Sequence, residues 1–334
     1  MTPREPAPAC WVVSDGTAGM EVQSVALARG LGFEPRIRRI TPLSPLRLAP
    51  WLGRVPGMPP AGPGHAMHAP YPQVAIGCGR RNAGAVIALK RLSRGRTLAI
   101  QIQDPRSARG LFDILVVPDH DPAAGPNVVT TRGSLNDIDD GTLDAAARRV
   151  EDRAAGLPRP LVAVNVGGDT RDHSVGPDGA AALAEALRGL ARDHGCGLLV
   201  TTSRRTGSHL RAALAELADE GGCVLWSGSG DGPNPYLGFL GLADRVVVTS
   251  DSVNMVCEAC ATGKPVHVIP LGRAPRRRRR FLDTMVAEGY IRWFDGRLGV
   301  WDYPPLRETE RVAGVLRARL VQAGVTAQVR DAST

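Results

Sequence analysis

Short apolar runs alternate with amphipathic segments along the chain. Apolar residues at 10–13 precede a small, turn-rich loop, and residues from about 20 to 31 then repeat apolar positions at helical spacing. The same unit of strand, glycine loop and helix returns at 73–92. Strand-like segments follow at 97–103 and 114–118. The first part of the chain is therefore predicted to alternate strands and helices.

The pattern restarts after a weakly patterned stretch, with an apolar run at 160–168 that ends in a glycine pair. Further strands are predicted at 197–203, 223–226, 245–249 and 265–270, and helices at 179–194, 209–220, 235–243, 252–262 and 308–323. Strands that alternate with helices are typical of parallel sheets. We predict an α/β protein of two Rossmann-like doubly wound domains that face each other across a cleft.

The length of 334 residues is typical of two domains. The expected boundaries are an N-terminal Rossmann-like domain at 1–145, a linker at 146–159, a C-terminal Rossmann-like domain at 160–305, and a C-terminal helix and tail at 306–334.

Positive charge gathers in two zones of the chain. The formal net charge is +8, yet residues 35–103 contain eleven basic residues and no acidic one, and residues 273–280 contain six arginines. The rest of the chain is net negative, so only these zones are expected to attract an anionic partner. Aromatic residues make up only 4% and no reader motif is present. Nucleic acid is therefore not an expected partner.

The first basic zone intersperses leucine, proline and Trp51 with arginines. A contact with an anionic membrane surface needs basic and apolar side chains together. The candidate membrane or anion patch consists of Arg36, Arg38, Arg39, Trp51 and Arg54. The alternative is an arginine-rich loop that packs over its own domain. No apolar run reaches 18 residues and no export signal is visible, so we expect a cytoplasmic protein, peripheral at the inner membrane face if the patch binds lipid.

Two glycine loops follow the first strand of each half. The loop at 14–21 reads SDGTAGME and lacks both the dinucleotide fingerprint and the P-loop motif. The segment VGGDTRDHS at 166–174 contains Gly167 and Gly168, which let backbone approach a ligand and whose N–H groups can form an anion-binding nest. Ordinary tight turns are the alternative for both loops.

The segment around residue 250 has the densest set of polar side chains. Thr249, Ser250, Asp251 and Ser252 precede a predicted helix, where hydroxyls and free N–H groups can hold a phosphate. Glu258, two turns on, can accept hydrogen bonds from ribose hydroxyls. A helix cap and a surface glutamate are the alternative.

Arg276–Arg280 forms an unbroken run of five arginines, with Arg273 just before it. It is interpreted either as a solvated loop or the start of a helix, or as a clamp on a diphosphate or anionic surface. Cys257 and Cys260 form a C-x-x-C inside the predicted helix, and we interpret them as small buried residues.

With these segments in place, the chain resembles the bacterial branch of the mitochondrial fission family named for elongated plant mitochondria. The resemblance rests on SDGTAGMEVQ, AIGCGRR, QIQDPR, LFDILVVPDHD, GPNVVTTRGSLN, VGGDTRDHS, TTSRRTG, NPYLGFLGLAD and TSDSVNMVCEACATGKPV, which span about residues 11–295. The plant member is regarded as a recruiter of a dynamin-related protein. This resemblance implies a scaffold that recruits partners.

The same segments are similar, more loosely, to GT-B glycosyltransferases such as the peptidoglycan N-acetylglucosaminyltransferase. That resemblance assigns the acceptor or membrane side to the N-terminal domain and the nucleotide sugar to the C-terminal one. It implies an acceptor-side loop of Ser14, Gly16, Thr17 and Gly19. It implies nucleotide-binding residues Gly167, Gly168, Asp169, Arg204, Ser252, Val253, Asn254 and Glu258, with Glu258 on the ribose.

The acceptor-side loop departs from the enzyme's pattern at one position. The enzyme has a histidine where this chain has Met20. The candidate catalytic bases are therefore Asp15, Glu21, Asp119 and His120.

The expected function is glycosyl transfer from a nucleotide-diphosphate sugar, of UDP type, to a cell-envelope-associated acceptor. We expect a metal-independent reaction with no cofactor, because no metal-ligand cluster is evident in the sequence. The alternatives are a non-catalytic GT-B-like scaffold and a sugar-nucleotide epimerase.

Overall fold

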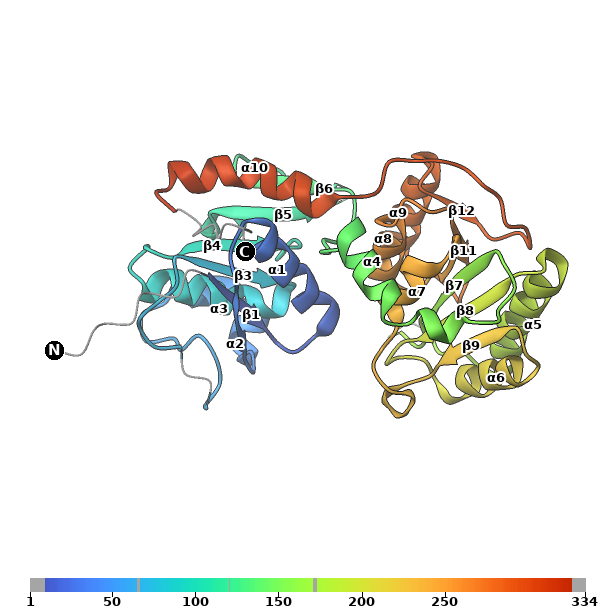
Figure 1. Ribbon diagram of the computed structural model, residues 1–334. Coiled ribbons are helices and arrows are strands. Elements are labelled where there is room, and N and C mark those ends of the chain that lie inside the picture. Colours follow the sequence, from blue (N-terminus) through green and yellow to red (C-terminus); the bar gives the residue numbers. More distant parts are fainter. Residues whose placement is uncertain (1–9, 65–66, 120, 171–172, 326–334) are drawn as a thin grey trace. The chain divides into compact units, whose positions relative to one another are not determined.

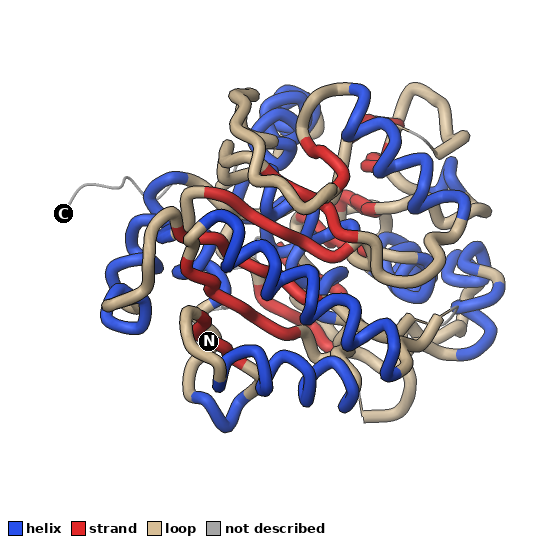
Figure 2. Tube along the Cα trace, turned by 90° about the vertical axis from the view of Figure 1, so that its right-hand side faces the viewer, coloured by secondary structure: helices blue, strands red, loops and turns tan. Residues whose placement is uncertain are grey.

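The chain divides into two compact units. The computed structural model describes residues 10–64, 67–119, 121–170 and 173–325. The first unit comprises Met1–Asp137 together with Glu308–Thr334, and the second comprises Ile138–Arg307. Figure 2 shows strands flanked by helices throughout.

The first unit contains a six-stranded parallel sheet in the order β2-β1-β3-β4-β5-β6. Its strands are β1 (Cys10–Ser14), β2 (Arg36–Arg39), β3 (Val74–Cys78), β4 (Leu98–Ile102), β5 (Ile114–Pro118) and β6 (Val128–Thr131). Its helices are α1 (Ala18–Gly30), α2 (Ser44–Leu48), α3 (Arg80–Leu92) and α10 (Glu308–Gln322), with short 3₁₀ turns η1 (Pro50–Arg54) and η2 (Arg109–Leu111).

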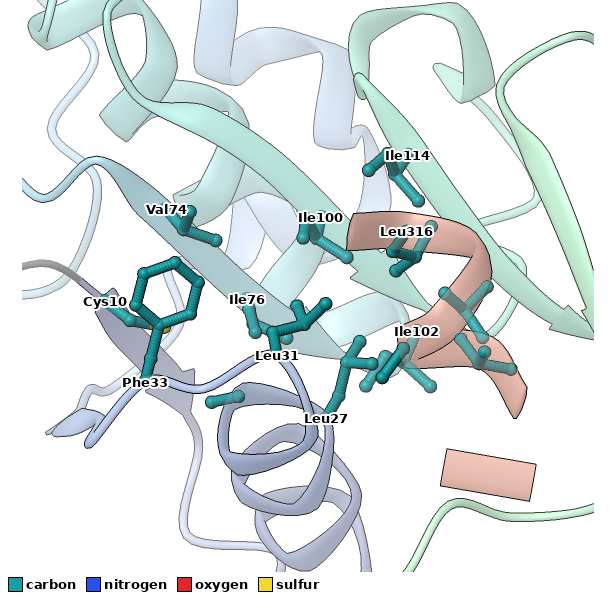
Figure 3. Packing of buried hydrophobic residues seen from close by; sticks show 14 of the residues in the cluster. Cys10, Leu27, Leu31, Phe33, Val74, Ile76, Ile100, Ile102, Ile114 and Leu316 are labelled. Carbon is teal, nitrogen blue, oxygen red and sulfur yellow. The ribbon is translucent and has the colours of Figure 1, made fainter. Parts of the chain in front are cut away.

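Both faces of this sheet are buried, as is usual for parallel sheets. On one face, Leu27 of α1 and Leu316 of α10 pack against Ile76 and Ile100 of the central strands (Figure 3). On the other face, Trp11 belongs to a second cluster with residues of α3. The last helix of the chain thus completes the core of the first unit.

The second unit repeats the architecture, with the strand order β12-β11-β10-β7-β8-β9 (Figure 1). Its strands are β7 (Leu161–Val166), β8 (Gly197–Thr202), β9 (Cys223–Trp226), β10 (Arg245–Thr249), β11 (Val266–Ile269) and β12 (Ile291–Trp293). Its helices are α4 (Asp140–Arg148), α5 (Pro177–His194), α6 (Ser208–Asp219), α7 (Tyr236–Leu242), α8 (Val253–Cys260) and α9 (Arg276–Ala287), with η3 (Glu151–Ala154) and η4 (Ser229–Asp231). Helices α5 and α6 cover one face of the sheet, and α7, α8 and α9 cover the other.

The predicted α/β fold class of two Rossmann-like doubly wound units is confirmed. The cleft between them stays a prediction. The structure divides the chain at other positions than the sequence pattern suggested. Residues 146–159, expected as a linker, lie within the second unit, because α4 packs on α7 and Val150 and Leu157 contact a buried cluster there.

Strand β2 escaped prediction because its sequence, Arg-Ile-Arg-Arg, is that of a solvated edge strand. Helix α9 begins within the arginine run, as one interpretation of that run suggested, but its extent and its apolar side, formed by Phe281, Leu282 and Met285, were not predicted. None of the described helices is long and apolar enough to cross a membrane.

Each sheet has a point where the strand order reverses. In the first unit this point lies between β1 and β3, and in the second it lies between β10 and β7. In open α/β sheets, ligands bind outside the carboxyl ends of the strands at such reversals. The loops that leave these four strands are therefore the places to look for a site.

Candidate functional site

A buried carboxylate lies at the reversal point of the second sheet. Asp251 follows β10, and its side chain is only 2% exposed. Its Oδ2 accepts the N–H of Gly168 at 3.1 Å and Nη2 of Arg205 at 2.8 Å. Its Oδ1 accepts the hydroxyl of Thr249 at 2.6 Å. These hydrogen bonds offset the desolvation of a buried charge and tie together the ends of β7, β8 and β10.

Neither residue of the glycine pair after β7 has room for a side chain, because other atoms of the protein lie too close. A Cβ on Gly167 would lie 2.1 Å from both carboxylate oxygens of Asp251, and one on Gly168 would lie 2.1 Å from the carbonyl oxygen of Arg205. The N–H of Gly167 donates to Thr249 Oγ1 at 2.8 Å, and that of Gly168 donates to Asp251. The two N–H groups that we expected to receive a diphosphate thus have acceptors inside the protein.

The loop after β8 carries two arginines with different surroundings. Arg204, the residue selected from the sequence, is exposed. Its neighbour Arg205 binds Asp251 and also donates from Nη1 to the carbonyl of Asp169 at 3.0 Å. The Asp169 side chain accepts the N–H of Val175 at 2.9 Å and so shapes the approach to α5. The motif TTSRRTG contained both arginines, but composition alone did not distinguish them.

Helix α8 begins at the same edge of the sheet. Ser252 caps it by accepting the N–H of Met255 at 3.4 Å, and Val253 and Asn254 form its first turn. The N-terminus of a helix favours anionic groups. The sequence left open which residue of 249–252 caps the helix, and the cap by Ser252 brings three of the proposed nucleotide-binding residues together.

Glu258 lies farther along α8 and is held by a tyrosine. The hydroxyl of Tyr236, on α7, donates to Glu258 Oε2 at 2.6 Å. Burial, with the charge of Glu258 adding to it, raises the pKa of Tyr236, so the phenol stays protonated and can donate. Sequence reasoning did not select Tyr236, although the quoted segment NPYLGFLGLAD contains it.

Cys257 and Cys260 are fully buried free thiols on α8. Burial raises the pKa of Cys260, which disfavours the reactive thiolate. The prediction that this pair consists of small buried residues is confirmed.

In the first unit, the acceptor-side loop is held by its own side chains. Ser14 Oγ accepts the N–H of Gly16 at 3.0 Å, and Asp15 Oδ1 accepts the N–H of Thr17 at 3.1 Å. Gly16 has φ +81°, a conformation that favours glycine. Gly19 already lies in α1, where its carbonyl accepts the side-chain amide of Gln23 at 3.0 Å.

Two of the four candidate bases are bound to arginines. The Asp15 side chain is 3% exposed and lies 3.2 Å from Nε of Arg81. Glu21 accepts two hydrogen bonds from Arg39, at 2.8 and 3.1 Å, and these lower the pKa of Glu21. A lowered pKa weakens a general base near neutral pH.

The other two candidates follow β5. Asp119 is exposed, and its N–H donates to the carbonyl of Thr131 on β6. His120 lies outside the described residues. Met20, at the position of the enzyme's histidine, packs its sulfur 3.3 Å from Sγ of Cys78 on β3.

In the part of the chain that the structure describes, one of the five residues of the candidate membrane patch forms an ion pair. Arg39 is bound by Glu21, so it is not a free cation. Arg36 and Arg54 are exposed, and Arg38 stacks 4.5 Å above the buried Trp11 ring.

Trp51, on η1, is 48% exposed, and Leu48 at the end of α2 is 77% exposed. Helices α2 and η1 pack on α3, whose residues share a cluster with Trp11. Arg38, Leu48 and Trp51 therefore lie on the same side of the first sheet.

The second unit has two adjoining hollows beyond β11. One, of about 480 Å³, is lined by Ser250, Pro270, Gly272, Arg273, Ala274, Arg279 and Trp293. The other, of about 530 Å³, is lined by His173, Leu271 and the first turn of α5, and it shares Pro270 and Gly272 with the first. Within the described residues, no group of three or more His, Cys, Asp or Glu side chains is arranged to hold a metal ion.

Solved structures support the GT-B-like fold. The UDP-GlcNAc 2-epimerase of Methanocaldococcus jannaschii matches with a TM-score of 0.56 at 12% sequence identity, covering 93% of this chain and 99% of that one. The same enzyme in complex with UDP-GlcNAc and UDP matches with a TM-score of 0.51 at 11% identity and the same coverage.

Sequence comparison reveals the family. The mitochondrial fission protein ELM1 of Arabidopsis thaliana is 33% identical over 281 residues, which are 76% of this chain and 65% of the plant protein. This chain thus spans slightly less than two thirds of that relative's length. The model of the mitochondrial fission ELM1 family matches residues 18–320. With that match and the motifs at both sheet edges, the chain belongs to the mitochondrial fission ELM1 family.

Proposed function

We propose that the second unit binds a nucleotide-diphosphate sugar of UDP type and that the protein transfers the glycosyl group to a cell-envelope-associated acceptor. The observation that carries the proposal is the carboxylate of Glu258, oriented by Tyr236 on the helix whose N-terminus is capped by Ser252. A carboxylate suits a pair of ribose hydroxyls, and a helix N-terminus suits a diphosphate. The fold shared with an enzyme crystallised with UDP-GlcNAc and UDP supports this choice.

In the proposed reaction, the acceptor oxygen forms a bond to the anomeric carbon while the bond from that carbon to the diphosphate breaks. The acceptor proton passes to a general base, and the nucleoside diphosphate leaves with the electron pair. The described candidates for the base are Asp119, which is exposed after β5, and Asp15 and Glu21, which are bound to arginines. Donors at the N-terminus of α8 would stabilise the leaving group.

The experiment is a thermal-shift screen of the full chain against UDP-, GDP-, CMP- and ADP-sugars. We expect a UDP-sugar to raise Tm, because a ligand that binds only the folded state stabilises it. Glu258→Gln should weaken that binding about tenfold. Glu216→Gln, which changes an exposed glutamate of α6, should leave it unchanged. Lack of stabilisation by any nucleotide sugar at millimolar concentration would contradict the proposal.

A non-catalytic scaffold is the second candidate, and one observation favours it. The N–H groups of Gly167 and Gly168, which we expected to receive a diphosphate, already donate to Thr249 and Asp251. Product analysis after nucleotide-sugar binding separates the candidates. Transfer to an acceptor supports the enzyme, binding without turnover supports the scaffold, and conversion of the sugar without acceptor would identify an epimerase.

We also propose that the patch of Arg36, Arg38, Leu48, Trp51 and Arg54 contacts an anionic membrane surface, which would place the protein at the cytoplasmic face of the membrane. Arginines supply the electrostatic attraction, and the exposed Leu48 and Trp51 supply apolar contact.

The membrane test is sedimentation with phosphatidylcholine vesicles that contain or lack phosphatidylglycerol. Changing Arg36, Arg38 and Arg54 to Ser should abolish binding to the anionic vesicles. Changing the exposed Arg148, Arg192 and Arg297 of the second unit to Ser removes the same charge and should leave binding intact. If both triple variants lost vesicle binding equally, the binding would depend only on net charge, and the proposed patch would be wrong.

A further inference from the structure

The start of α9 places cations where a helix disfavours them. Its first five residues are Arg276–Arg280, and its first turn contains no acidic side chain. The N-terminal end of a helix carries a partial positive charge, so arginines there reduce stability, and neighbouring arginines repel one another. A segment that lowers stability in this way is characteristic of a functional site.

Arg279 of this segment and Arg273, three residues before the helix, line the hollow of about 480 Å³, together with Ser250 and Trp293. Arg279 is held in place there, since its Nε donates to Asp283 at 3.1 Å and its guanidinium lies 5.5 Å from the centre of the Trp293 ring. A guanidinium has five N–H donors, and the bond to Asp283 uses only one of them. Arg279 is thus oriented and retains donors for a ligand.

The neighbouring Arg278 anchors the wall of the hollow to the sheet edge. Its Nη1 donates to the carbonyl of Asp251 at 3.1 Å, and its Nη2 donates to the carbonyl of Arg273 at 3.4 Å. The segment that carries Arg273 is therefore tied to the end of β10. Ser250, in the lining, stands only two residues before Ser252, which caps α8. The arginine-lined hollow thus adjoins the start of the helix proposed to hold the nucleotide.

We propose that this hollow, with Arg273, Arg279 and Ser250, binds the phosphate groups of a nucleoside diphosphate. The glycine pair was one sequence-based choice for this role, alongside the arginine run and the start of α8, but Asp251 and Thr249 accept its N–H groups. The planar fork of arginine matches phosphate oxygens and gives strong charge-assisted hydrogen bonds. The adjoining hollow of about 530 Å³ offers space for the uncharged part of the ligand. The nucleoside part of this inference rests on the proposed function, and the phosphate part does not.

The experiment is calorimetric titration of the full chain with inorganic pyrophosphate at constant ionic strength. Arg273→Gln/Arg279→Gln should weaken binding at least tenfold. Arg276→Gln/Arg280→Gln removes the same charge from the same segment, away from the lining, and should change the affinity less than twofold. Arg273→Gln alone should weaken binding severalfold. Among the residues that the structure describes, its side chain has no hydrogen bond or ion pair, so this single variant keeps the test valid if the Arg279 change impairs folding.

Two results would overturn the phosphate site. One is equal loss of pyrophosphate affinity in the two double variants, which would mean attraction to a basic zone only. The other is unchanged affinity in Arg273→Gln/Arg279→Gln. A parallel titration with UDP separates this inference from the proposed function. If UDP binding depends on Glu258 but not on the two arginines, the hollow is not the phosphate site and the proposed function is retained. If pyrophosphate binds through the arginines while no UDP compound binds, the phosphate site in the hollow is supported and the proposed function is contradicted.

Discussion

The N–H of Gly168 donates to Oδ2 of Asp251 across the point where the second sheet reverses its strand order, at 3.1 Å. An anion of the protein itself thus fills the place that a bound phosphate was expected to take. The first unit has a related pair, since Asp15 after β1 lies 3.2 Å from Arg81 in α3, which follows β3. At both reversal points, therefore, an aspartate that follows a strand forms an ion pair with an arginine.

Gly167→Ala should destabilise the second unit by about 3 kcal/mol, because its Cβ would lie 2.1 Å from the buried Asp251 oxygens. Urea unfolding measures the loss. Gly189→Ala is the control, since it lies inside α5 with only the end of Arg192 within 4 Å. It should stabilise the helix by about 0.5–1 kcal/mol. A Gly167→Ala variant as stable as the wild type would mean that Asp251 moves away freely.

Glu308 should make the first unit sensitive to acid. Burial alone would raise its pKa, but hydrogen bonds from Arg311 and from the N–H of Arg132 outweigh burial and lower the pKa below the ordinary 4.5. The folded state therefore favours the carboxylate, so this stability is present above about pH 4.5 and is lost as pH falls through the lower folded pKa. Tm measured from pH 3 to 7 should show a steeper acid loss for wild type than for Glu308→Gln.

Glu310→Gln is the control for that measurement, because Glu310 is exposed on the same helix, α10. Its profile should follow that of the wild type. Parallel profiles for wild type and Glu308→Gln would show that Glu308 does not contribute to the acid sensitivity.

Arg276→Glu should stabilise the protein by about 0.3–1 kcal/mol, because it replaces a cation with an anion at the positive end of α9 and relieves repulsion within the run. Thermal unfolding at low ionic strength measures the gain, and added salt should reduce it. The same change at Arg192, in the last turn of α5, should have the opposite sign. Destabilisation by Arg276→Glu would indicate that this arginine has a structural partner.

Tyr236→Phe should cost about 1–2 kcal/mol, since it removes a hydrogen bond to the partly buried Glu258 carboxylate. If Glu258 binds ribose, the variant should also weaken binding of UDP. Tyr71→Phe is the matched control, because the structure gives the Tyr71 hydroxyl no hydrogen bond within the described residues. Normal UDP affinity in Tyr236→Phe would leave the tyrosine with a structural role only.

The sequence by itself determined the fold class and most of the elements. Buried parallel strands read as apolar runs, such as Leu161–Val166, and the glycines after them mark the turns into helices. A helix cap among residues 249–252 was also readable, because a cap depends on neighbours along the chain. The burial of Cys257 and Cys260 was expected from their place inside the predicted helix. Strand β2 was not predicted, because arginines conceal its apolar pattern, and for α9 only a helix start was offered as one interpretation of its arginines.

Only the tertiary structure decided which polar groups remain open to a ligand. Local sequence does not show that Asp251 reaches Gly168, or that Arg39 reaches Glu21, because the partners lie 83 and 18 residues apart along the chain. The same holds for the hollow that joins Ser250 to Arg273 and Arg279. The sheet brings such residues together by aligning the carboxyl ends of strands that are distant in the chain. Hydrogen bonds across that edge then determine which donors the protein satisfies internally.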